Sequence, residues 1–384
     1  MPDWLFVLWA GGTALLSYSL VYALRKPFTA AEFEGLQVYG MDYKIAVSII
    51  QLLGYVSAKL LGIKYISELR PEGRLKFIIG SAALSEISLI AFGVLPIPYN
   101  IVALYFNGLS LGCMWGVIFS FLEGRRTTDI LASIMGVSMA LSSGVAKSLG
   151  LYALNQLHVS EFWMPALIGA NLLLTVQRDI KEDFIVCIID VQTISSWAFA
   201  QIDSIATFVL LAVFALLATT YNHLKVLCML LILSTFGMGT LAFLGATEGN
   251  EHIPTTIWLF LQSLCLDIAY LSFQTIFFER FIACFKIKGN VGFFIITIDF
   301  VGYLGTLGLL LFKEFCASHI DWTSFYNHMS LFIGVACCLS FIASLIYMIY
   351  ARKRKQSPLP EKAEQPETRK NEKENNIYLT TSAI

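Results

Sequence analysis

Two phenols and a cation share one face of the first long apolar segment. Tyr18, Tyr22 and Arg25 fall within a narrow wedge of a helix, because each residue advances ~100° around the axis. Charged groups within membrane segments usually turn toward a bundle interior or a wet cavity, where they mark substrate or ion paths. This stripe is therefore a candidate transport site. A second interpretation stays open, in which Arg25 and Lys26 anchor the helix end at the lipid headgroups.

A second polar stripe follows in the next apolar segment. Gln51, Tyr55 and Lys59 recur at four-residue spacing, so they share one helix face that ends in a cation. Together with Arg25, this face predicts a positively charged pocket between helices.

Single ionisable residues occur within several later segments. Each acidic residue is expected to carry a proton, to pair with Lys59 or Lys147, or to lie near a wet segment end, and pairing is the favoured role. The candidates for a proton-carrying or ion-paired role are Glu86, Asp203, Asp267, Asp299 and Lys147.

The fourth apolar segment carries a row of small residues. Gly108, Gly112 and Gly116 are spaced by four, so they lie on one face of a helix. Such a face lets a neighbouring helix approach closely, which predicts a structural role in packing.

The composition indicates a polytopic membrane protein. Hydrophobic residues make up 57% of the 384 residues, charged residues make up 14%, and the mean hydropathy is +0.70. The net charge of -1 gives no reason to expect a nucleic-acid partner. The cysteines and histidines form no metal-ligand spacing, and no catalytic triad, phosphate-binding loop or dinucleotide turn is present. We therefore expect no metal, no cofactor and no enzyme activity.

Eleven apolar runs are long enough, or nearly so, to cross a bilayer. Lys and Arg cluster in alternate connections, which predicts that those connections and both chain termini are cytoplasmic. The runs lie near residues 4–24, 45–63, 76–95, 98–121, 130–154, 162–176, 196–219, 224–246, 256–279, 290–312 and 328–350.

The alternation requires one more crossing than the apolar runs supply. Residues 162–195 would have to cross twice, but at ~1.5 Å per residue they reach only about 51 Å, against roughly 60 Å for two crossings. We infer a missing piece near residue 176. The predicted organisation is an N-terminal six-helix half (1–176), a C-terminal half with a truncated seventh helix (177–351) and a disordered cytoplasmic tail (352–384).

Several motifs carry a family resemblance. The run Tyr22-Ala23-Leu24-Arg25-Lys26-Pro27-Phe28 resembles the first-helix motif of the organophosphate:phosphate antiporter branch of the major facilitator superfamily. The run 53–59 resembles its second helix, 108–116 its fourth, 178–183 its seventh and 300–305 its eleventh. The runs Arg25–Phe28, Asp42-Tyr43-Lys44 and 285–290 are still more similar to an uncharacterised, mainly bacterial membrane-protein family related to this superfamily.

The resemblance implies an all-α major facilitator fold of 11–12 transmembrane helices in two pseudo-symmetric halves. It also implies that Arg25 and Arg178 face each other across the axis and clamp a phosphate dianion, with Lys59, Tyr18 and Tyr22 in support. The expected function is secondary transport of a small anionic metabolite, such as a phosphorylated one, by a monomer in the inner or plasma membrane. The alternative is a transporter-like sensor or accessory protein that binds a ligand without turnover.

Overall fold

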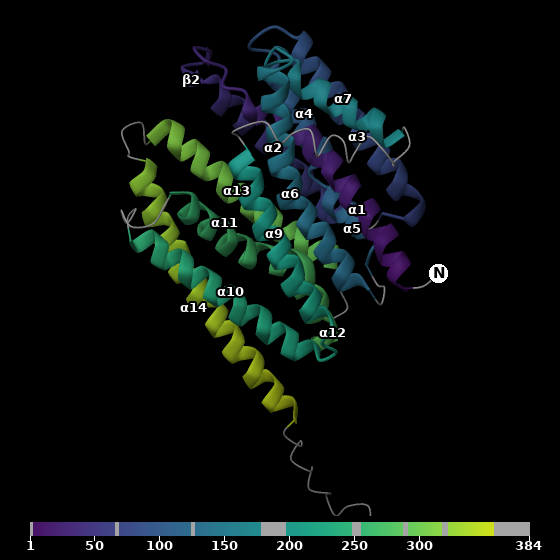
Figure 1. Cartoon of the computed structure of the whole chain (residues 1–384), viewed down its shortest axis with the longest axis vertical. Coiled ribbons are helices and arrows are strands. Elements are labelled where there is room, and N and C mark those ends of the chain that lie inside the picture. Colours follow the sequence, from purple (N-terminus) through teal and green to yellow (C-terminus); the bar gives the residue numbers. More distant parts are fainter. Residues whose placement is uncertain are drawn as a thin grey trace, which may run out of the picture.

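The computed structural model (Figure 1) describes residues 3–65, 69–123, 127–177, 197–247, 255–286, 291–316 and 322–356. Within these residues the chain is almost entirely helical, as expected for a backbone that must satisfy its own hydrogen bonds in lipid. A two-residue antiparallel hairpin, β1 (Gln37–Val38) with β2 (Met41–Asp42), is the exception. The all-α prediction is confirmed apart from this hairpin.

The helices before residue 178 include one short break in the fourth predicted segment. That segment stops at Gly112–Cys113 and resumes, so it forms two helices. The elements are α1 (Asp3–Arg25), the 3₁₀ turn η1 (Pro27–Ala30), α2 (Tyr43–Tyr65), α3 (Pro71–Val94), α4 (Ile101–Leu111), α5 (Met114–Phe119), α6 (Thr128–Asn155) and α7 (Met164–Gln177).

The helices after residue 196 include a π-helical turn within the predicted run 256–279, and α12 continues this run past its predicted end to Phe285. The elements are α9 (Trp197–Ala218), α10 (His223–Ala246), α11 (Thr255–Ser272), the π turn η3 (Phe273–Phe277), α12 (Phe278–Phe285), α13 (Val291–Cys316) and α14 (Trp322–Gln356).

Nine helical segments within the described residues are long and apolar enough to cross a membrane, which establishes a multi-pass membrane protein. They correspond to nine of the eleven predicted runs. The other two runs are α7, which has only 14 residues, and α9, whose apolar described part is Phe208–Ala218. The predicted missing piece near residue 176, the second crossing it implies and residues 357–384 of the predicted tail lie outside the described residues. The start of that tail was predicted wrongly, because α14 continues to Gln356 and residues 352–356 are helical.

The first part of the connection between α1 and α2 is buried, with Phe28, Ala31 and Phe33 at most 3% exposed, whereas Tyr39 in the hairpin is 90% exposed. Phe33 packs edge-on against Tyr43 with ring centroids 5.0 Å apart, and it also contacts Phe162 at 5.4 Å. The Glu161 carboxylate accepts hydrogen bonds of 3.0 Å from the backbone N–H groups of Glu32 and Phe33. These contacts fix the chain immediately after Arg25, so the C-terminal end of α1 is held from both sides.

The predicted glycine face brings α2 and α4 into backbone contact. A Cβ atom added at Gly108 would lie 2.1 Å from the Gln51 carbonyl oxygen, and one added at Gly54 would lie 2.2 Å from the Tyr105 carbonyl oxygen. Only a residue without a side chain fits at such a distance. The packing role predicted for Gly108 is confirmed.

Several element pairs join early and late parts of the chain. α2 packs along α13 and α6 packs along α9, and α5 also contacts α13 while α6 also contacts η3. Within each part, α1 packs on α6, α2 on α4, and α10 on both α11 and α14, and Figure 1 shows α10 and α14 side by side. The division into two pseudo-symmetric halves stays a prediction.

We predict that Gly108→Ala destabilises the protein by about 1–3 kcal/mol, because the new methyl group forces α2 and α4 apart. Thermal unfolding of the purified protein in detergent measures this change. Gly80→Ala, on α3, is the control because a Cβ there meets nothing within 4 Å. Equal melting temperatures for the two variants would contradict the close contact.

Candidate functional site

The site begins where α1 ends inside the protein. The last carbonyl groups of a helix have no partner within the helix, and a buried end must find partners elsewhere. Asn107 on α4 donates to the Leu24 carbonyl at 3.1 Å, and Gln51 on α2 donates to the Arg25 carbonyl at 3.3 Å. These two amides therefore set where Arg25 sits.

The two amides are themselves linked and buried. Gln51 donates to the Asn107 side-chain oxygen at 2.8 Å, and Asn107 donates to the Ser85 hydroxyl at 2.7 Å. Asn107 is 0% exposed. The close approach of α2 to α4 at Gly108 places the neighbouring Asn107 within reach of Gln51.

Three aromatic rings surround the Arg25 guanidinium. Its central carbon lies 4.2 Å from the ring centroid of Tyr55, 5.4 Å from that of Tyr303 and 5.9 Å from that of Tyr22. Tyr55 on α2 and Tyr303 on α13 stack with an interplanar angle of 14°. Cation–π contacts of this kind stabilise a partly desolvated cation without neutralising it.

Arg25 differs from Lys59 and Arg280 in having no acidic partner within the described part of the chain. Among the residues that the structure describes, no carboxylate oxygen lies within 4.0 Å of its guanidinium. Lys59, in contrast, pairs with Asp299 of α13, whose second oxygen accepts a hydrogen bond from Gln274 of η3. The side chains of Lys59 and Asp299 are 4% and 7% exposed, so this is a buried ion pair with both carboxylate oxygens satisfied.

Tyr303 lies next to both positive groups. The Lys59 ammonium is 5.4 Å from its ring centroid, the same distance as the Arg25 guanidinium. The Tyr303 ring therefore lies next to both Arg25 and Lys59, of which Lys59 is paired with Asp299. We call the set Tyr22, Arg25, Tyr55, Lys59, Asp299 and Tyr303 the charge cluster.

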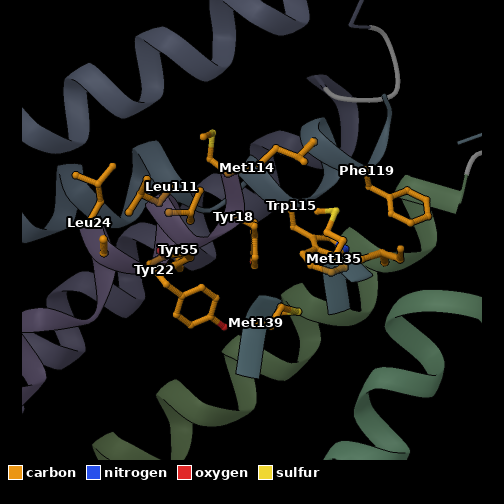
Figure 2. Packing of buried hydrophobic residues seen from close by; sticks show 14 of the residues in the cluster. Tyr18, Tyr22, Leu24, Tyr55, Leu111, Met114, Trp115, Phe119, Met135 and Met139 are labelled. Carbon is orange, nitrogen blue, oxygen red and sulfur yellow. The ribbon is translucent and has the colours of Figure 1, made fainter. Parts of the chain in front are cut away.

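An aromatic layer extends the charge cluster along α1. Tyr18 packs edge-on against Tyr22 at 5.5 Å and against Trp115 of α5 at 4.8 Å. Figure 2 shows Tyr18 beside Trp115 and the Tyr22 ring turned toward Met139. The Tyr55 hydroxyl and the Trp115 indole N–H are buried without a hydrogen-bond partner in the described part of the chain. The layer therefore offers polar groups that a ligand could engage.

The structure gathers six of the seven predicted substrate-binding residues, and the seventh lies outside the described residues. Six of them lie together: Tyr18, Tyr22, Arg25, Gln51, Tyr55 and Lys59. Arg178 lies outside the described residues, as does the side chain of Asp203 on α9. The predicted arginine clamp therefore stays a prediction.

The other predicted ionisable residues have varied surroundings. Asp299 is paired with Lys59, and Asp267 on α11 is half-buried. Lys147 is exposed on α6. Glu86 on α3 lies against Gly169, and both of its carboxylate oxygens lack a hydrogen-bond partner among the described residues.

Two polar groups that connect helices were not predicted from the sequence. Asn107 was detectable as an amide within an apolar run. A second ion pair joins Arg280 of α12 to Asp129 of α6. Only the folded structure reveals this pair, because the two residues lie 151 positions apart in the sequence. Arg280 also approaches the Thr220 carbonyl and His223 Nδ1, each at 3.2 Å.

We predict that Asp299→Asn destabilises the protein by about 3–5 kcal/mol, because it leaves the buried Lys59 ammonium uncompensated. The double variant Lys59→Met with Asp299→Asn should recover most of this loss. Chemical unfolding of the parent, the single variants Lys59→Met and Asp299→Asn, and the double variant measures the coupling. Additive effects of the two changes would show that the ion pair has no energetic role.

One family model matches the chain in two stretches, residues 27–173 and 168–353, and it describes a family of unknown function (DUF5690). No protein with a curated description matches the sequence. The two stretches meet beside the point near residue 176 where the sequence predicts a missing piece.

Proposed function

We propose a function for this chain, which belongs to the family of unknown function DUF5690: it is a secondary transporter of a small anion, such as a phosphorylated metabolite. The proposed architecture is of the major facilitator type, in which residues 1–176 and 177–351 form two halves that expose a central site alternately to each side.

The observation that carries this proposal is the free Arg25 guanidinium. It is half-buried, it is held at a fixed helix end, and no carboxylate among the described residues neutralises it. A guanidinium presents a planar fork of donors that matches the oxygens of phosphate or carboxylate. An unpaired cation within a membrane protein is costly unless a ligand uses it.

The contacts of α1 and α2 with α13 at the charge cluster support a movement of the two parts of the chain relative to each other. The charge cluster combines α1 and α2 from the early part of the chain with α13 from the late part. One stacked ring pair and one ion pair form the polar part of the junction, beside an apolar part that includes Ile49, Leu52 and Leu307. Such contacts can be exchanged for contacts with an anion, because phosphate oxygens can replace Asp299 beside Lys59 and can bind Arg25.

A sensor or accessory protein is the second candidate, and the two inter-helix ion pairs favour it. Lys59–Asp299 joins α2 to α13, and Arg280–Asp129 joins α12 to α6. If both pairs persist with ligand bound, the protein binds an anion without carrying it across.

We predict that Arg25→Lys weakens the binding of inorganic phosphate about tenfold, because a point charge replaces a bidentate fork. Equilibrium dialysis of the purified protein with labelled phosphate measures this. Arg74→Lys is the matched control, since Arg74 bonds the Ser120 carbonyl at 2.8 Å, away from the charge cluster.

Exchange of labelled phosphate by the protein in liposomes separates the two candidates. The transporter proposal predicts exchange that Arg25→Lys reduces and Arg74→Lys preserves. Phosphate binding without exchange would favour the sensor, and equal phosphate affinity in Arg25→Lys would remove Arg25 from the site.

A further inference from the structure

A buried carboxyl group lies where three helices of the early part of the chain meet. A Cβ atom added at Gly169 of α7 would clash with Oε2 of Glu86 on α3, and it would lie 2.8 Å from Cδ2 of Leu24 on α1. The Glu86 carboxyl group and the Leu24 side chain therefore lie side by side over the backbone of Gly169. The absence of a side chain at Gly169 leaves the space that the carboxyl group occupies.

The Glu86 carboxyl group has no partner for a charge. Both of its oxygens are buried, and neither has a hydrogen-bond partner among the described residues. No titratable side chain that the structure describes on α1, α4, α5 or α7, the helices that pack on α3, faces this carboxyl group. An ionised carboxylate buried without a partner is so costly that such a group takes up a proton instead. The surroundings of Glu86 therefore favour its neutral form.

Two other acids at helix contacts have different surroundings. Asp299 pairs with Lys59, and Asp129 pairs with Arg280. Each of these carboxylates thus has a cation beside it, which Glu86 lacks. Of the three acids, Glu86 is the one whose negative charge nothing in the described part of the chain would balance.

Glu86 also belongs to the contacts that fix the end of α1. Its neighbour Ser85 accepts a hydrogen bond of 2.7 Å from Asn107, and Asn107 donates to the Leu24 carbonyl at 3.1 Å. The Leu24 side chain lies beside the Glu86 carboxyl group. One turn of α3 therefore acts on both the backbone and the side chain of Leu24, the residue that precedes Arg25.

We propose that Glu86 is a proton-binding site and that its proton favours anion binding at Arg25, so that the anion moves together with a proton. Proton binding does not depend on the proposed function, whereas its coupling to the anion rests on it. When the proton passes to water, an unpaired charge remains between α3 and α7 and must draw in water or separate these helices. Either change disturbs the contact with Leu24 and so shifts Arg25. By linkage, a bound anion strengthens proton binding by the same factor.

A permanently neutral side chain that only fills the contact is the competing role for Glu86. That role needs no carboxyl group, because an apolar side chain would fill the same space without burying two oxygens that lack hydrogen bonds. The presence of a titratable group at this contact therefore favours proton binding.

Infrared spectroscopy of the protein in lipid nanodiscs tests proton binding, because a protonated carboxyl group has a C=O band distinct from that of a carboxylate. We predict that the parent at about pH 6 has such a band, that Glu86→Gln removes it, and that it is lost as the pH rises to about 9. Glu161→Gln is the matched control: both Glu161 oxygens accept backbone hydrogen bonds, so this substitution should remove no such band. Glu86→Met repeats the measurement if Glu86→Gln does not fold.

Equilibrium dialysis with inorganic phosphate at the same two pH values tests the coupling. Between them, the phosphate affinity of the parent should fall at least about fivefold more than that of Glu86→Gln, because the titration of phosphate itself is common to both proteins. Absence of the band, a band that persists at high pH, or equal losses of affinity would overturn the inference and leave the proposed function standing. If neither protein binds phosphate while the band behaves as predicted, the proposed function and the coupling are overturned and the proton site is supported by itself.

Discussion

The interior end of α1 is the constraint on which the rest of the structure depends. A helix that stops within a membrane protein leaves carbonyl groups that lipid cannot satisfy. Asn107 and Gln51 satisfy two of them, and the glycine contact between α2 and α4 brings these amides to the right place. The Arg25 side chain is thereby held between helices, against the rings of Tyr22, Tyr55 and Tyr303.

Charge is distributed unevenly among the interior cations. Lys59 and Arg280 each have a carboxylate, and each pair links helices far apart in the sequence. Arg25 has aromatic rings instead, which lower the cost of its partial burial but leave its donors available. The same arrangement of rings and pairs thus stabilises the helix contacts and provides the proposed anion site.

Local features of the fold and site were predictable from the sequence, whereas contacts across the chain were not. Hydropathy and length located nine spans, because a bilayer imposes them directly. Four-residue spacing placed Tyr18 and Tyr22 near Arg25 on one face, and Tyr55 and Lys59 near Gln51 on another. Residues 59 and 299 are 240 positions apart, however, and no local pattern selects Asp299 over Asp267 or Glu86 as the partner of Lys59. Tyr303 and Asn107 gained their roles only through helix packing.

The most direct test of the account is the distance between α2 and α13 with and without inorganic phosphate. Spin labels are placed at Leu60 and Val301, which are both exposed on the outer faces of these helices. Pulsed electron paramagnetic resonance then measures the distance between the labels in a cysteine-free background. The account predicts that phosphate shifts the distance distribution in the parent protein and that Arg25→Lys suppresses the shift. A distribution that stays unchanged while phosphate is bound would contradict transport through this site.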